Sequence, residues 1–158
     1  MSSVRIHRPK YALAAMLRKP GGTTVAEAVV RAETNLEGLQ EAAWLQLDSG
    51  LAQMEALFAR YGDVFDGDLI AEHYRLAVSL IGLPSLCDLD ALENAAHSLC
   101  DLLDRLATTG RWDRGGVQVH VQALRLLRSL PAGADAVAEP VLDGLRKVRE
   151  RHAILSSN

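Results

Sequence analysis

Aromatic residues are scarce in this sequence: Phe, Trp and Tyr together make up 4% of its 158 residues. Alanine and leucine take their place, and such a composition favours helices over sheets. The two cysteines, Cys87 and Cys100, form no CxxC pair and no cluster with histidines, so neither a disulfide framework nor a structural metal is indicated. We therefore expect a helical cytoplasmic protein with one self-sufficient core.

The motifs of several enzyme classes are also missing. The sequence has no GxSxG elbow, no GxxxxGK phosphate loop, no GxGxxG turn and no HExxH pair, so hydrolase, nucleotidase, dehydrogenase and metalloprotease chemistry lacks its first requirement. The histidines are dispersed along the chain, at positions 7, 73, 97, 120 and 152. We expect no metal, no cofactor and no catalytic residue of these classes.

No apolar run approaches the ~20 residues of a membrane span. The longest near the N-terminus, residues 11–17, is followed at once by Arg18 and Lys19 and lacks the cleavage site of a signal peptide. Charge is uneven: the net charge is -3, yet residues 1–23 hold five basic residues and no acidic one. We expect a basic flexible arm over 1–23, a helical domain over 24–152 and a disordered tail over 153–158. The acidic body and the absence of a reading motif argue against nucleic-acid binding.

Apolar periodicity predicts five helices and no strand. The first helix is expected over 25–61, straight or bent near Gly38, with a stripe of apolar residues at steps of three and four. This stripe consists of Leu36, Leu39, Ala43, Leu47, Leu51, Met54 and Leu57. The later helices are expected at 67–82, 88–108, 113–130 and around 141–148. Short turns between them predict an all-α antiparallel bundle of the four-helix type with a long first helix.

Local signals mark the ends of these helices. Thr24 and Glu27 have the spacing of a capping box, and Asp66 or Asp68 is a suitable N-cap for the second helix. Pro84 and Gly110 are expected to follow the ends of the second and third helices. Asp113 is expected to begin the fourth helix, and Pro140 to lie in the first turn of the last.

Residues 73–82, "HYRLAVSLIG", followed by "LENAAHSLCDLLDRL" and "VQVHVQALRLLRSL", resemble the histidine-phosphotransfer helical bundle. The active helix of one bacterial variant reads roughly Tyr-Arg-Leu-Ala-His-x-x-Lys-Gly. Residues 74–77 and Gly82 match that string. Val78 stands where the phosphorylated histidine would be, and Ile81 stands where the lysine would be.

The combination of "KPGGTTVAEA", "SLCDLLDR", "WDRGGVQVHVQALRLLRS" and "GLRKV" is similar to the CheE-like family of small alphaproteobacterial chemotaxis proteins. The resemblance covers most of residues 18–150. It implies a role in chemotaxis and two-component signalling, with CheY-like receiver domains of response regulators or the chemotaxis histidine kinase as partners.

The two substitutions remove phosphotransfer chemistry from this helix. A histidine supplies the nucleophile that takes a phosphoryl group, and a lysine one turn on steadies its charge, but valine and isoleucine do neither. We expect Arg75, Val78, Ile81 and Gly82 to form a partner-binding face without catalysis. The alternative is that Val78 and Ile81 simply face the core.

Other residues leave other functions open. His97 begins a "HSL" string and is an alternative phosphorylation site, although Cys100 stands where a lysine would help and Asp101 would repel phosphate. His73 and His120 lie beside apolar stripes, where a packed neutral imidazole is the commoner state. The acid–amide pairs Asp90/Asn94 and Glu37/Gln40 have the spacing to position a water against a receiver phosphate. A homodimerisation module is a further alternative.

Overall fold

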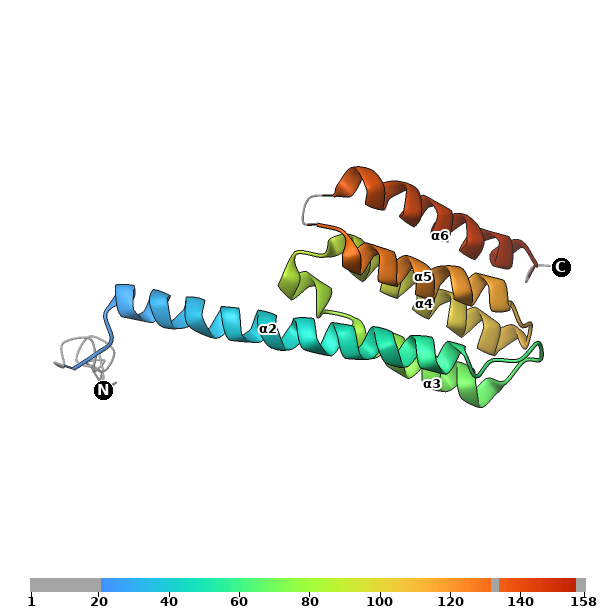
Figure 1. Cartoon of the computed structure of the whole chain (residues 1–158), viewed down its shortest axis with the longest axis horizontal. Coiled ribbons are helices and arrows are strands. Elements are labelled where there is room, and N and C mark those ends of the chain that lie inside the picture. Colours follow the sequence, from blue (N-terminus) through green and yellow to red (C-terminus); the bar gives the residue numbers. More distant parts are fainter. Residues whose placement is uncertain (1–20, 132–133, 156–158) are drawn as a thin grey trace, which may run out of the picture. The chain divides into compact units, whose positions relative to one another are not determined.

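The structure is a computed structural model that describes residues 21–131 and 134–155. Over these residues it contains five α-helices and one 3-10 turn, and no strand. They are α2 (Val25–Phe58), α3 (Gly67–Leu80), η1 (Pro84–Cys87), α4 (Asp90–Thr109), α5 (Arg114–Ser129) and α6 (Asp135–Leu155). The expected all-α class is confirmed (Figure 1). Most of the basic arm predicted over 1–23 lies outside the described residues.

By its internal contacts the chain divides into two units, residues 1–37 and 38–158. In the first unit, the described residues include the beginning of α2, which starts with the predicted capping box. The Glu27 carboxylate accepts the Thr24 backbone N–H at 2.8 Å, and the Thr24 hydroxyl accepts the Glu27 N–H at 3.2 Å. The pKa of Glu27 is lowered because its carboxylate accepts hydrogen bonds from the Thr24 backbone N–H and from the Thr24 hydroxyl. The helix therefore begins where its own sequence satisfies the first free N–H groups.

In the second unit, α4 is the central helix. It contacts α3, α5 and α6, and it buries more side chains than any other described helix. The rest of α2 packs on α3, where the Gly50 backbone approaches the Leu80 side chain. It also packs on α5, where Arg128 lies over the Trp44 ring and pairs with Asp48 at 2.8 Å. Leucine dominates the interior, in keeping with the composition.

Most predicted boundaries are confirmed by their caps. Asp66 accepts the N–H groups of Asp68 and Leu69, Asp113 accepts that of Gly116, and Gly110 closes α4 in the left-handed region at φ 63°.

Two expectations were wrong. Leu36 and Leu39 are exposed, so the buried stripe of α2 begins only at Ala43. The last helix starts at Asp135 rather than at Pro140, which lies one turn further in. The ring of Pro140 has no N–H for the Ala136 carbonyl, yet the helix continues to Leu155 and so includes residues 153–155 of the predicted tail.

Candidate functional site

The residues expected to bind a partner lie mainly on the exposed side of α3. Ile70, His73, Ala77 and Leu80 form its buried side. Arg75 and Val78 are exposed on the other side together with Tyr74, and Val78 keeps 44% of its surface exposed. The alternative that Val78 faces the core is therefore wrong. Ile81 is half-buried and packs against the core. It therefore lies beneath the exposed face of α3 and contributes little surface to it.

Gly82 ends this face in a conformation suited to glycine. Its φ is +88°, in the left-handed region where a Cβ is strained, and the space around it is open. Its N–H donates to both carboxylate oxygens of Glu93, each at 3.0 Å. Glu93, in the first turn of α4, therefore fixes the position of the exposed Gly82 backbone at the end of α3.

The same carboxylate reaches a second predicted residue. Glu93 Oε1 lies 3.4 Å from Nε2 of His97, whose side chain is exposed. The structure thus brings His97 and Gly82 together through Glu93. Sequence reasoning missed Glu93, although its i,i+4 spacing to His97 on a helix was a signal. Because Nε2 faces a carboxylate, that nitrogen is not turned outward toward a phosphoryl donor.

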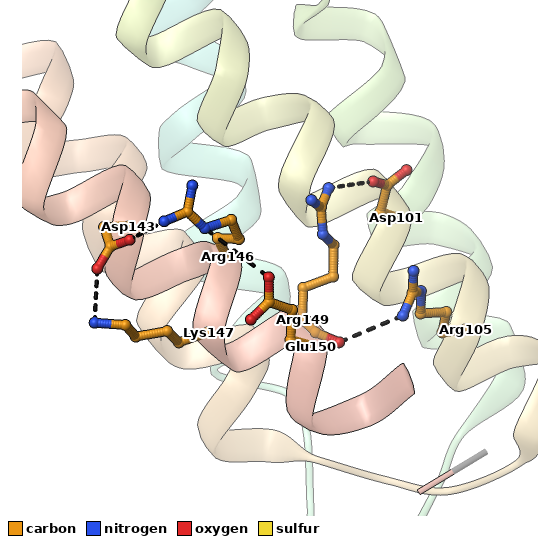
Figure 2. Close-up of polar contacts among 7 residues, drawn as sticks. All are labelled: Asp101, Arg105, Asp143, Arg146, Lys147, Arg149 and Glu150. Atoms are coloured by element: carbon orange, nitrogen blue, oxygen red, sulfur yellow. Dashed lines mark hydrogen bonds and ion pairs between the residues drawn. The ribbon is translucent and has the colours of Figure 1, made fainter. Parts of the chain in front are cut away.

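A groove between α4 and α6 lies beside His97. Asn94 and His97 line one wall, and Leu142, Arg146 and Arg149 line the other. The arginines could steady an anion, and Asp101 was expected to repel one. Figure 2 shows that Arg149 points across to Asp101, at 2.6 Å. Arg149 of α6 therefore compensates the charge of Asp101. The repulsion that Asp101 would exert on a phosphoryl group at His97 is weaker than the sequence suggests.

The other charges in Figure 2 belong largely to α6 itself. Asp143 pairs with Arg146 and, at 2.7 Å, with Lys147. The hydrogen bond from Lys147 is the main cause that lowers the pKa of Asp143. Arg105 donates across from α4 to the Arg149 carbonyl at 3.4 Å. Arg146 and Lys147 are thus paired with an acid of α6 itself, and Arg149 is paired with Asp101 of α4, which argues against a strong anion site in the groove.

The remaining histidines with described side chains are buried. His120 lies between α5 and α4: its Nδ1 is 2.8 Å from the Gly116 carbonyl and its Nε2 is 3.0 Å from the Ser98 hydroxyl. A carbonyl only accepts, so Nδ1 donates and Nε2 accepts from Ser98. His73 has no exposed surface and stacks on Tyr61. Neither ring is accessible to a phosphoryl donor, and the expectation of packed imidazoles is confirmed.

Cys100 takes the place where a lysine would support His97. Burial raises the pKa of its thiol to about 11, so the group is neutral at physiological pH and brings no charge to His97. Of the acid–amide pairs, Asp90 and Asn94 are both exposed on α4. Glu37 is exposed and Gln40 is half-buried. Among the described residues, no group of three or more potential ligands is arranged to hold a metal.

An apolar groove of about 290 Å³ borders the exposed face of α3. Tyr74 and Arg75 line it from α3, and Leu103, Asp104 and Ala107 line it from α4. Arg75 has no ion-pair partner in the described part of the chain. This surface therefore offers a partner an apolar recess that Arg75 and Asp104 edge with one charge of each sign.

None of the described helices has the length and apolar character needed to cross a membrane. Comparisons with protein-family models, with curated proteins and with solved structures found no match.

Proposed function

We propose that this protein is a cytoplasmic, non-enzymatic regulator of chemotaxis or another two-component pathway that binds CheY-like receiver domains through the exposed face of α3. The observation that carries the proposal is the exposure of Val78. The phosphotransfer pattern would have its histidine there, and a valine with 44% exposure presents an apolar contact where the pattern would present a nucleophile. The assignment to chemotaxis rests on the resemblance in sequence, and the proposed mode of binding rests on the exposed face of α3.

The chemistry of this face suits binding without transfer. Tyr74 and Val78 offer apolar surface, and the exposed Arg75 offers a positive charge to the acidic phosphorylation pocket of a receiver domain. Gly82 leaves open space at the end of the helix, which lets a second domain approach closely. Bound in this way, the protein would alter the lifetime of the receiver phosphate or the choice of downstream partner. The chemotaxis histidine kinase is the alternative partner for the same face.

A substitution at Val78 tests the proposal directly. We expect Val78→Asp to weaken receiver binding by about 10-fold or more, because it places a carboxylate against an acidic pocket and in an apolar contact. Isothermal titration of the full chain with receiver domains from the same organism, phosphorylated and unphosphorylated, measures the effect. Val119→Asp on α5 is the matched control, since Val119 is 43% exposed. Equal affinities for both variants would remove this face from the proposal.

A second candidate, an active phosphotransfer protein that uses His97, is favoured by one observation. His97 is exposed beside Arg146 and Arg149, although Glu93 holds its Nε2. Mixing the protein with receiver domains carrying labelled phosphate separates the two candidates. Label that moves to this protein and disappears with His97→Ala would establish the second candidate. Absence of label together with a stable complex or a changed decay rate of the receiver phosphate supports the first.

A further inference from the structure

The apolar groove between α3 and α4 carries one charge of each sign on its edge. We call it the α3–α4 recess, and it is lined by Ile70, Ala71, Tyr74, Arg75, Leu103, Asp104 and Ala107. Its volume of about 290 Å³ lies just below the ~300–1,000 Å³ of small-molecule sites. The recess is therefore suited to side chains of a partner protein rather than to a cofactor.

The two charges at this edge have no partner within the described part of the chain. Arg75 and Asp104 are both exposed, and neither forms an ion pair or a hydrogen bond through its side chain to another described residue. Their charged neighbours are already engaged. Glu72, one turn before Arg75, pairs with Arg60 at 3.2 Å. Arg105, next to Asp104, donates to a carbonyl of α6 at 3.4 Å. A partner that completes this surface brings an acid to Arg75 and a base to Asp104.

A second copy of the same surface supplies both charges. A two-fold axis through the recess places Arg75 of each copy opposite Asp104 of the other, because a pair of unlike charges is complementary to itself under that rotation. The apolar walls of the two copies then meet between the two ion contacts. Tyr74, which is 39% exposed, adds an aromatic side chain of the kind enriched at protein interfaces. Charge and apolar surface are thus both matched by a second copy.

We propose that this protein forms a two-fold dimer through the α3–α4 recess, in which Arg75 and Asp104 of one copy pair with Asp104 and Arg75 of the other. The dimer covers Tyr74 and Arg75, which are also part of the face proposed to bind receiver domains. A second copy and a receiver therefore compete for the same residues. This competition rests on the proposed function, whereas the dimer itself does not, so the dimer is tested without any receiver.

Charge reversal at the recess tests the dimer, by sedimentation equilibrium of the full chain over a range of micromolar concentrations. We expect wild type to pass reversibly from monomer to dimer. Arg75→Asp and Asp104→Arg should each raise the dissociation constant by about 10-fold or more, because each places like charges opposite one another at both contacts. Arg31→Asp and Glu41→Arg are the matched controls: they make the same changes of charge at exposed positions outside the recess and should dimerise like wild type.

A mixture of the two reversed variants tests the two-fold arrangement itself. In a mixed pair, the new aspartate at position 75 of one copy faces the new arginine at position 104 of the other, and the native Asp104 and Arg75 face each other at the second contact. An equimolar mixture of Arg75→Asp and Asp104→Arg should therefore form a heterodimer at concentrations where each variant alone is monomeric. Far-UV circular dichroism checks that every variant keeps its helices.

Three results would overturn the proposal. A wild type that stays monomeric at every concentration would show that the recess does not join two copies. A dimer that persists in both Arg75→Asp and Asp104→Arg would place the interface elsewhere. Variants that are monomeric alone and remain monomeric when mixed would show that these two charges do not face each other across a two-fold axis. None of these results bears on receiver binding, which Val78→Asp tests separately.

Discussion

At the scale of single residues, His73 and Tyr61 are the least satisfied part of the core. Their rings stack with centroids 5.8 Å apart, and both residues are buried. Neither His73 nitrogen nor the Tyr61 hydroxyl has a hydrogen-bond partner within the described part of the chain. Burial of His73 disfavours its charged form and lowers its pKa from 6.5 to about 4. Burial likewise raises the pKa of Tyr61, with smaller contributions from Asp66 and Glu72.

The lowered pKa of His73 predicts a pH-dependent stability. Between pH 6.5 and about 4 the unfolded state binds a proton at His73 and the folded state does not. Stability is therefore fully present above pH 6.5 and falls as the pH drops through this window. The loss should reach up to about 3 kcal/mol of unfolding free energy, measured by urea denaturation at several pH values.

His73→Phe should remove that pH dependence and raise stability at neutral pH, because phenylalanine keeps the stacking on Tyr61 and has no ring nitrogens to satisfy. Tyr61→Phe serves as the control, since it removes the unpartnered hydroxyl but keeps His73 in place, and it should leave the slope unchanged. A His73→Phe variant with the same slope as wild type would show that other groups cause the acid sensitivity.

Sequence reasoning placed His73 and His120 in the core but could not tell them apart. The ring nitrogens of His120 hydrogen-bond to a hydroxyl on α4 and to a carbonyl one turn back on α5. The His73 ring instead stacks on Tyr61, and its nitrogens have no hydrogen-bond partner among the described residues. The difference depends on which residue of a neighbouring helix arrives at each ring, and periodicity along one helix carries no such information. For the same reason, the bond from Gly82 to Glu93 was not predicted.

At the scale of helices, two glycines in α2 have opposite roles. A Cβ added at Gly50 would lie 2.5 Å from Cδ2 of Leu80, which is buried in the contact with α3. A Cβ added at Gly38 would meet nothing within 4 Å. Gly50 therefore allows α2 and α3 to approach each other closely, while Gly38 weakens the helix without a compensating contact.

Alanine at these two positions gives a paired prediction. Gly38→Ala should stabilise the protein by about 0.5–1 kcal/mol, the usual gain from replacing glycine within a helix. Gly50→Ala gains the same propensity but must displace Leu80, so its unfolding free energy should lie about 1–3 kcal/mol below that of Gly38→Ala. Chemical denaturation of the two variants measures the difference directly. Equal stabilities would mean that Leu80 repacks without cost.

Helix ends were largely predictable and helix partners were not. Thr24, Asp66, Gly110 and Asp113 act through bonds to neighbours within a few residues, so the local sequence specifies them. The start of α6 was missed because proline was expected only in the first turn of a helix. The exposure of Leu36 was missed because a periodic stripe shows that a face is apolar, without showing whether another helix covers it.

At the scale of the whole bundle, stability is unevenly distributed between α4 and α6. Nine buried residues lie on α4, among them Leu99 and Leu102. On α6, the buried residues with described side chains are Ala138 and Leu145, and ion pairs such as Arg149 with Asp101 add contacts at the partly exposed edge. Exposed pairs of this kind are worth at most about 1 kcal/mol, so the attachment of α6 depends mainly on its few apolar contacts.

This imbalance predicts that α6 opens before the rest of the bundle. Leu145→Ala should cost about 2–5 kcal/mol locally and accelerate amide exchange throughout α6, while α4 and α5 keep most of their protection. Leu124→Ala, which removes an equally buried leucine from α5, should instead speed exchange in all helices by lowering global stability. Native-state hydrogen exchange followed by mass spectrometry resolves the two patterns. If Leu145→Ala speeds exchange in α4 and α5 as much as in α6, then α6 unfolds with the bundle as one cooperative unit, and its sparse burial does not make it separable.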